Sequence, residues 1–268
     1  MKNNQISLNP AAISRALGLL AFVLVLASTA TQAADYLTGY SSGLLAKLVK
    51  VFSTDLELNV PNFFSTLIMI CAALLLAFIT VLKRKQKAPY VWHWAILSLG
   101  FLFMAFDEIV SAHEKMVEPL RAVLGGENLG ILYFAWVVPG IALVLFLAFF
   151  FLKFWLSLPM KPKIAFLVAA VFYIGGAIGM ELVGGKYYES HGKDNLTYII
   201  LTTIEESFEL TGVIVFIRAL LAYITETYAE VKLQFGMPRA DKQNSAEILM
   251  TPRNSFSKKR AQGKPITV

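Results

Sequence analysis

Thr203-Ile-Glu-Glu-Ser-Phe-Glu-Leu-Thr-Gly212 places three carboxylates inside an apolar segment that runs from about residue 196 to 224. That segment is long enough to cross a bilayer, because a spanning helix needs about 20 residues. Glu205 and Glu209 are four residues apart and share one helix face, with Glu206 about 100° away. Ionised carboxylates are costly in hydrocarbon, so they usually face a bundle interior, a water-filled cavity or a partner. The stretch therefore predicts a membrane helix that presents acids to a polar interior.

The composition indicates the same environment for the whole chain. Its 268 residues are 57% hydrophobic and only 16% charged, and the mean hydropathy is +0.62. Soluble domains carry about 25% charged residues, so this is the composition of a membrane protein. The net charge of +6 is explained by basic residues flanking apolar segments rather than by nucleic-acid binding. We expect the lipid bilayer as a partner, and we find no haem, nucleotide or flavin motif.

Apolar periodicity predicts an all-α, polytopic transmembrane bundle. Spanning segments are expected at about 11–34, 63–82, 90–106, 129–156, 164–182 and 196–224. The first segment has a basic start and small residues at its end, which is also the pattern of a secretory signal peptide. The bundle therefore has six spans, or five if the first segment is cleaved.

The chain divides into four predicted regions. These are an N-terminal helix or signal peptide (1–34), a periplasmic segment with an amphipathic helix at about 43–52 (35–60), a bundle of five helices (61–224), and a basic, disordered tail (225–268). Basic residues gather at one end of the spans, most densely at Lys83-Arg-Lys-Gln-Lys87. The positive-inside bias assigns that end, and the C-terminal tail, to the cytoplasm.

This topology brings the acids of different spans to one side of the bilayer. The third and fifth spans run outward and the sixth runs inward, so their acids all fall in the outer half. We expect them to converge on one pocket that opens to the periplasm. The core residues of this predicted metal or cation site are Asp107, Glu108, Glu205, Glu206 and Glu209, and the second choices are Glu181, Glu114 and His113.

The geometry of a regular helix limits what His113 could contribute. Such a helix would align four side chains at spacings of four, three and four residues: Asp107, Ser111, Glu114 and Glu118. It would point His113 about 120° away from Asp107. Only a distorted helix end, or His191 from the loop before the sixth span, would add an imidazole to the acids.

Carboxylates this close together need a compensating cation or protonation in a low dielectric. One outcome is a bound divalent metal ion: oxygen ligands suit Ca²⁺, Mg²⁺ or Mn²⁺, and an imidazole would admit Zn²⁺ or iron. A second is a path for protons or cations. A third is a polar site for a lipid or polyol head group, whose hydroxyl groups would donate hydrogen bonds to the carboxylates.

Four motifs occur in this order over about residues 55 to 225: Asn59-Val-Pro-Asn-Phe-Phe-Ser65, Phe106-Asp-Glu-Ile-Val-Ser-Ala-His-Glu114, Gly176-Ala-Ile-Gly-Met-Glu181 and Thr203–Gly212. Together they resemble an uncharacterised family of bacterial polytopic inner-membrane proteins. The resemblance implies that the carboxylates are the family's signature and that the location is the bacterial inner (cytoplasmic) membrane. It implies no activity, and it leaves out the first span and the tail.

Three function hypotheses follow from these observations. The first is a bundle with a cation or metal site open to the periplasm, where a metal would activate water against a lipid-borne substrate and a spare carboxylate would act as base. The second is a proton- or cation-coupled transporter. The third is an assembly protein whose acids bind basic residues of a membrane partner. The sequence leaves open the ion, the substrate and whether the chain forms a homo-oligomer.

Overall fold

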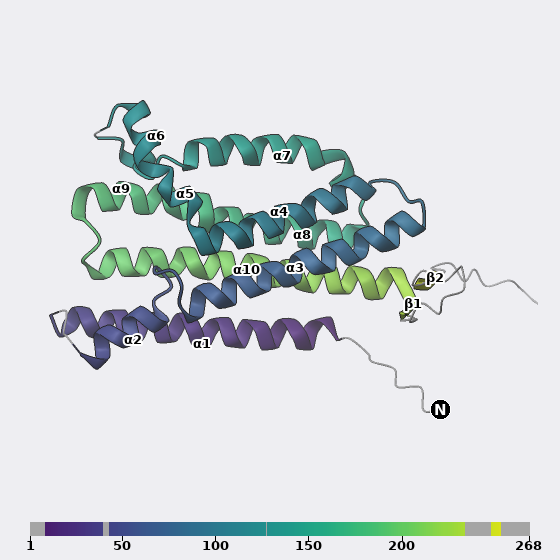
Figure 1. Cartoon of the computed structure of the whole chain (residues 1–268), viewed down its shortest axis with the longest axis horizontal. Helices are drawn as coiled ribbons and strands as arrows, with labels where there is room; N and C mark the ends of the chain where they lie inside the picture. Colours follow the sequence, from purple (N-terminus) through teal and green to yellow (C-terminus); the bar gives the residue numbers. More distant parts are fainter. Residues whose placement is uncertain (1–8, 40–42, 127, 234–247, 253–268) are drawn as a thin grey trace, which may run out of the picture. The chain divides into compact units, whose positions relative to one another are not determined.

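The computed structural model describes residues 9–39, 43–126, 128–233 and 248–252. Within them, six helices are long and apolar enough to cross a membrane (Figure 1). These are α1 (Pro10–Leu37), α3 (Val60–Lys85), α4 (Val91–Val110), α7 (Val137–Ser157), the continuous helix Met160–His191, and α10 (Leu196–Thr227). The prediction of an all-α membrane bundle with six spanning helices is confirmed, and the chain is a multi-pass membrane protein.

The motif at residue 59 starts α3 and fixes the loop before it. The side chain of Asn59 accepts a hydrogen bond from the backbone N–H of Asn62 at 3.1 Å, which caps the helix. Its amide also donates to the carbonyl of Ser53 at 2.6 Å. Pro61 lies in the first helical turn, where its missing N–H costs nothing. The loop from residue 53 to 59 is thereby held against the end of α3.

The core of the bundle is built on α3, which packs along α4. Ile68, Ala72, Leu76 and Ile79 are at most 1% exposed, and their spacing of four, four and three residues is that of one helix face. Ser98 of α4 donates to the carbonyl of Ala73 at 2.8 Å, so a polar bond joins the two helices inside the apolar interface. The packed helices α3 and α4 form one side of the bundle, next to the cavity described below.

The fifth spanning helix contains a distorted segment next to α10. It consists of α8 (Met160–Ile174), the π-helical turn η2 (Gly175–Met180) and α9 (Glu181–His191). A Cβ atom on Gly176 would lie 2.8 Å from the carbonyl of Glu205, and one on Gly212 would lie 2.7 Å from the backbone nitrogen of Tyr173. The two backbones therefore touch at these glycines. Gly176 and Gly212 make this close approach, whereas Gly179 has open space beside it.

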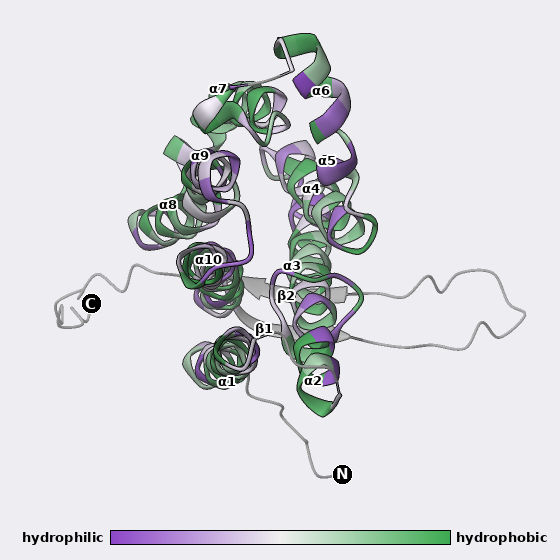
Figure 2. Cartoon of the chain, turned by 90° about the vertical axis from the view of Figure 1, so that its left-hand side faces the viewer, coloured by the Kyte–Doolittle hydropathy of each residue, from purple (hydrophilic) through white to green (hydrophobic). Residues whose placement is uncertain are grey.

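The outward faces of the spanning helices are apolar. On α7, Leu145, Phe146 and Phe149 are 55%, 63% and 78% exposed. Figure 2 shows the helices largely hydrophobic along their length, with hydrophilic residues on α5 (Ala112–Lys115) and α9. Exposed phenylalanines of this kind are expected where a helix faces lipid.

Two element boundaries differ by several residues from the sequence expectations. The fourth span begins at Val137 instead of about 129, because residues before it form the 3₁₀ turn η1 (Gly130–Leu132). The carboxylate of Glu189 accepts the backbone N–H groups of Leu129 and Gly130, both at 2.8 Å, and holds this segment out of the helix. The fifth span continues to His191 instead of 182. Two further short helices are α2 (Leu44–Phe52), where the amphipathic helix is expected, and α6 (Val117–Leu124).

A second compact unit begins at Ala222. It contains the end of α10 and an antiparallel pair of strands, β1 (Tyr228–Leu233) and β2 (Ile248–Pro252), with Leu233 opposite Ile248. The remaining residues of the predicted tail, 234–247 and 253–268, lie outside the described residues. So do residues 1–8 of the predicted N-terminal region.

Candidate functional site

A cavity of about 730 Å³ lies at the end of the bundle where α4 stops and α10 begins. Its walls come from the α2–α3 loop, the start of α3, the end of α4, α5, α6, the segment before α7, η2, α9 and the first half of α10. Ten acidic residues line it: Asp55, Glu57, Asp107, Glu108, Glu114, Glu118, Glu181, Glu205, Glu206 and Glu209. Lys193 is the only lysine or arginine among the described residues that line it.

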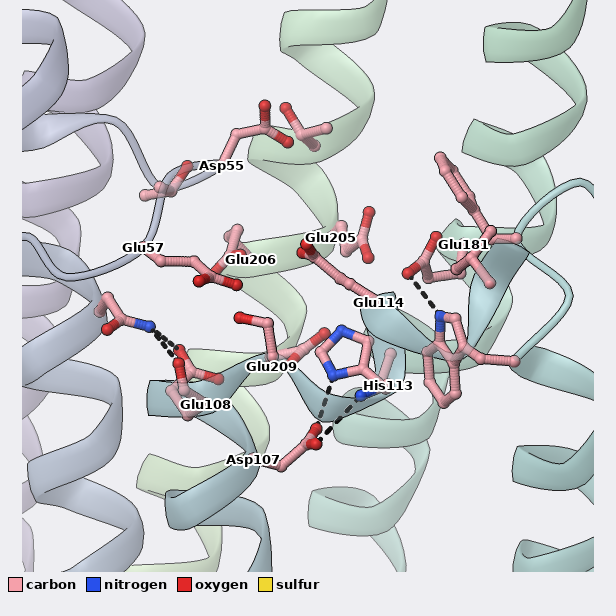
Figure 3. Close-up of a pocket in the computed structure, with 18 of the residues that line it drawn as sticks. Asp55, Glu57, Asp107, Glu108, His113, Glu114, Glu181, Glu205, Glu206 and Glu209 are labelled. Carbon is pink, nitrogen blue, oxygen red and sulfur yellow. Dashed lines mark hydrogen bonds and ion pairs between the residues drawn. The ribbon is translucent and has the colours of Figure 1, made fainter. Parts of the chain in front are cut away.

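The structure brings together all eight residues expected at the site, and Figure 3 shows them around one space. It adds Asp55 and Glu57, which the sequence reasoning missed because they precede the second span in a loop. One signal was available: both acids come just before the motif at Asn59, whose capping bonds hold that loop in place. Lys115 and Lys186, the basic residues that follow Glu114 and Glu181 most closely in the sequence, do not line the cavity.

The three glutamates of α10 form the deepest acidic group. Glu205, Glu206 and Glu209 are half-buried. None of their three side-chain carboxylates makes a hydrogen bond or ion pair with another described residue. Their position depends on η2, because Gly176 lets that turn reach the backbone of Glu205 and the Cγ atom of Glu209. A π-helical turn beside a polar cavity is common at functional sites. These carboxylates are therefore free to meet a ligand.

The end of α4 is broken at Ser111, which corrects the expectation of a regular helix through residues 107–118. Ser111 adopts a left-handed backbone with φ of +48° and separates α4 from α5. The break turns His113 back toward Asp107 instead of 120° away. Nδ1 of His113 lies 2.5 Å from Oδ2 of Asp107, and the backbone N–H of His113 donates to Oδ1 at 3.2 Å. The distorted helix end thus supplies the imidazole.

This contact changes the protonation of His113, which lies outside the spanning helices. Burial alone would lower the pKa of His113, but the hydrogen bond and negative charge of Asp107 outweigh it. The negative charges of Glu114 and Glu181 also raise the pKa of His113. The pKa of His113 is therefore raised above its ordinary value of 6.5.

Two other carboxylates, Glu108 and Glu181, are held by polar side chains, and Ser65 is one of the partners of Glu108. The side-chain amide of Asn62 donates to the backbone carbonyl of Glu108 at 2.7 Å and to its Oε1 at 3.2 Å. The indole N–H of Trp136 donates to Oε1 of Glu181 at 2.9 Å. The ring of Trp136 also lies 4.9 Å from that of His113, so one aromatic side chain joins the imidazole to Glu181. The walls of the cavity are thus fixed by side chains from α3, α4 and the start of α7.

Asp55 and Glu57 sit where the cavity opens. Desolvation by the surrounding protein, with a smaller contribution from the charge of Glu114, raises the pKa of Asp55 from 3.8 to about 6. The same two causes raise the pKa of Glu57, with Lys115 opposing them. The mouth of the cavity therefore changes its charge between mildly acidic and neutral pH.

The predicted metal ligands share the cavity but do not form a ready coordination shell. Among the residues that the structure describes, no group of three or more His, Cys, Asp or Glu side chains is arranged to hold a metal ion. The negative charge is spread over a space much larger than one ion instead of being focused on a point.

The fold and cavity define a multi-pass membrane protein with a carboxylate-lined cavity at one end of its helices. Residues 16–224 match the family described as Domain of unknown function (DUF8692), and the chain belongs to that family. This match agrees with the resemblance to an uncharacterised family, and from residue 16 onward it includes the first span, which the motifs alone left out. No curated protein and no solved structure matches the chain.

Proposed function

We propose that this protein binds a cation in the acidic cavity. The observation that carries the proposal is the charge of the lining: ten carboxylates face one space with a single lysine among them. Two unit charges 4 Å apart interact by about 4 kcal/mol at an effective dielectric of about 20. Several unpaired carboxylates in one cavity therefore favour either protons or a bound cation.

In this proposal, Glu205, Glu206 and Glu209 are the principal ligands, because they have no other partner among the described residues. Asp55 and Glu57 would attract the cation at the mouth. Asp107, held by His113, and Glu108, held by Asn62, would supply fixed oxygens opposite α10.

We infer the side of the membrane from charge. The basic turns that contain Lys83, Lys87 and Lys163 lie at the ends of the helices away from the cavity, which supports a periplasmic opening and a cytoplasmic C-terminal tail in a bacterial inner membrane. Metal-dependent attack on a lipid-borne substrate and cation-coupled transport stay predictions. Both require the binding step proposed here.

Terbium luminescence tests this binding step. Tb³⁺ is a general probe for carboxylate sites, and energy transfer from the cavity's own Trp136 and tyrosines would report its arrival. We expect saturable binding to the detergent-purified chain. The Glu205→Gln/Glu206→Gln/Glu209→Gln variant should weaken it at least tenfold, which corresponds to about 1.4 kcal/mol.

Asp194→Asn is the matched control. It removes an acid at the same end of the molecule that does not line the cavity. Its Tb³⁺ affinity should stay within about twofold of the wild type, a change of less than about 0.5 kcal/mol. Equal affinities in the triple variant and the wild type would refute a cation site in the cavity.

A further inference from the structure

The aromatic side chains of the cavity form a continuous surface beside the acids. We call Tyr133, Phe134, Tyr188 and Tyr198 the aromatic wall; all four line the cavity. The ring centroids of Tyr133 and Tyr188 are 5.1 Å apart, those of Phe134 and Tyr188 are 5.6 Å apart, and those of Tyr188 and Tyr198 are 5.5 Å apart. Such a surface contributes nothing to the coordination of a bare metal ion, but it suits alkyl chains and ammonium groups.

The wall already holds one cation of the protein itself. The guanidinium carbon of Arg121 lies 4.1 Å from the ring centroid of Tyr133. Its Nη1 also pairs with Glu118 at 3.0 Å, so Arg121 meets an aromatic ring and a carboxylate at the same time. Tyr198 offers the same pair of contacts to a ligand, since Asp55, Glu181 and Glu205 lie near it.

Tyr198 adds a polar group to the aromatic wall. This residue is only 9% exposed and lines the cavity. Its hydroxyl makes no hydrogen bond with any described residue, although buried tyrosine hydroxyls usually find a partner. A polar group this well enclosed, beside a cavity of carboxylates, has its hydrogen-bonding capacity available to whatever enters.

The size of the cavity and the spread of its charge exclude a simple fit to one ion. About 730 Å³ lies within the range of pockets that hold small organic molecules, about 300–1,000 Å³. The acids come from the α2–α3 loop, α4, α5, α6, α9 and α10, and no three of the described His, Cys, Asp or Glu side chains are grouped to hold a metal ion. Several positive charges placed along one molecule would match this distribution better than a single divalent ion.

We propose that the cavity binds an organic polyamine: a linear molecule with two or more ammonium groups separated by alkyl segments. The ammonium groups meet the carboxylates of α4 and α10, and the alkyl segments lie against the aromatic wall. The hydroxyl of Tyr198 pairs with an ammonium group at its end of the cavity. This inference rests on the proposed cation binding and specifies its ligand class.

Displacement of Tb³⁺ by spermidine tests the inference on the full detergent-purified chain. Competitors are compared at matched ionic strength: spermidine and putrescine as polyamines, propylammonium as a single-charge amine, and Mg²⁺, Ca²⁺, Mn²⁺ and Zn²⁺. We expect spermidine to compete at a concentration at least tenfold lower than propylammonium or Mg²⁺. Oligolysine is added to test whether the site instead takes a basic segment of a partner protein.

Two aromatic variants separate the polyamine from other cations. Tyr188→Leu should weaken spermidine binding about fivefold through loss of the ring contact, and Tyr198→Phe should weaken it about threefold while keeping the ring. Neither should change the Tb³⁺ affinity by more than about twofold, because lanthanide binding depends on the carboxylates. Tyr198→Phe keeps the volume of the side chain and serves as the readout if Tyr188→Leu fails to fold.

The outcomes distinguish the two proposals. If divalent metals displace Tb³⁺ and spermidine does so only at the concentration of propylammonium, cation binding stands and the polyamine assignment is overturned. Binding of oligolysine without spermidine overturns it as well, in favour of a protein partner. If both aromatic variants weaken Tb³⁺ binding and spermidine binding equally, the aromatic wall does not contact the polyamine and the assignment is overturned. If Tb³⁺ does not bind at all, the proposed function itself fails.

Discussion

At the scale of single residues, Asp107 and His113 form the best-defined contact of the cavity, with Nδ1 and Oδ2 2.5 Å apart. The sequence places both residues at the site but predicts them on different faces of one helix. The reason lies in Ser111, which takes the left-handed conformation although it is neither glycine nor asparagine. No residue type marks the break, so spacing alone could not have paired the two side chains.

The pair predicts a pH-dependent contribution to stability. Because the pKa of His113 is raised in the folded protein, the imidazolium–carboxylate bond is fully present below pH 6.5 and is lost as the pH rises through the raised value. We expect His113→Gln to lower the unfolding free energy by about 1–2 kcal/mol at pH 6. The cost should shrink above pH 8, and thermal unfolding in detergent across this range measures it. A cost that is the same at both pH values would contradict the ion pair.

Asp55 predicts how cation binding responds to pH. Its raised pKa of about 6 means that the mouth of the cavity gains a negative charge between pH 5 and 7. We expect the Tb³⁺ affinity to rise over this interval, by about tenfold if Asp55 contributes about 1.4 kcal/mol to binding. The Asp55→Asn variant should show a smaller rise of Tb³⁺ affinity between pH 5 and 7, whereas the control Asp194→Asn should show the same rise as the wild type. An unaltered profile in Asp55→Asn would remove Asp55 from the site.

At the scale of elements, the packing of the fifth spanning helix against α10 depends on two glycines. We expect Gly176→Ala and Gly212→Ala each to lower the unfolding free energy by about 1–3 kcal/mol, because the added Cβ would meet backbone atoms within 3 Å. Gly179→Ala is the matched control, since its Cβ would meet nothing within 4 Å. It should be neutral or stabilise the helix by up to about 1 kcal/mol.

Detergent melting temperatures of the three variants provide the comparison. Gly176→Ala should also weaken Tb³⁺ binding, because its Cβ would press on the Cγ atom of Glu209. Equal melting temperatures for Gly176→Ala, Gly212→Ala and Gly179→Ala would show that the close approach of the helices does not limit stability. The spacing of Gly175 and Gly179, four residues apart, is typical of close helix packing, but it does not indicate that Gly176, and not Gly179, makes the contact.

Helix boundaries show a second limit of the sequence. The positions of the spans follow from runs of apolar residues, and all six are present. The start of α7 could not be predicted, since Leu129 and Ile131 are as apolar as the helix itself. Glu189 removes their segment from the helix by accepting two of its backbone N–H groups, and it comes from sixty residues further along the chain. Long-range polar contacts of this kind leave no local pattern.

At the scale of the whole molecule, alternating span directions explain why the acids meet. Asp107 and Glu108 end one helix, Glu181 lies toward the same end of another, and Glu205 to Glu209 lie near the start of a third. Apolar length and direction were sufficient to predict this convergence. The size of the cavity, the entry of Asp55 and Glu57 and the aromatic wall depend on loops and side-chain packing, which periodicity does not encode.

The six spans predict which loops share a side of the membrane. In a Cys71→Ser background, Lys87→Cys and Asp194→Cys should react with a membrane-impermeant maleimide from opposite sides, because the loops that carry them lie at opposite ends of the spanning helices. Labelling of intact spheroplasts and of inverted vesicles measures this, and we expect Asp194→Cys to react in the spheroplasts. Reaction of both positions from the same side would contradict the proposed topology.

A cation bound between α4 and α10 would shield the carboxylates around it, and mapping of carboxylate reactivity measures this shielding. The purified protein is treated with a carbodiimide and glycine methyl ester, with and without saturating Tb³⁺, and each modified acid is quantified by peptide mass spectrometry. We expect bound Tb³⁺ to lower the extent of modification of Glu205, Glu206 and Glu209 several-fold. Asp194 should be modified equally with and without Tb³⁺. Unchanged reactivity of the three glutamates at saturating Tb³⁺ would contradict cation binding between α4 and α10.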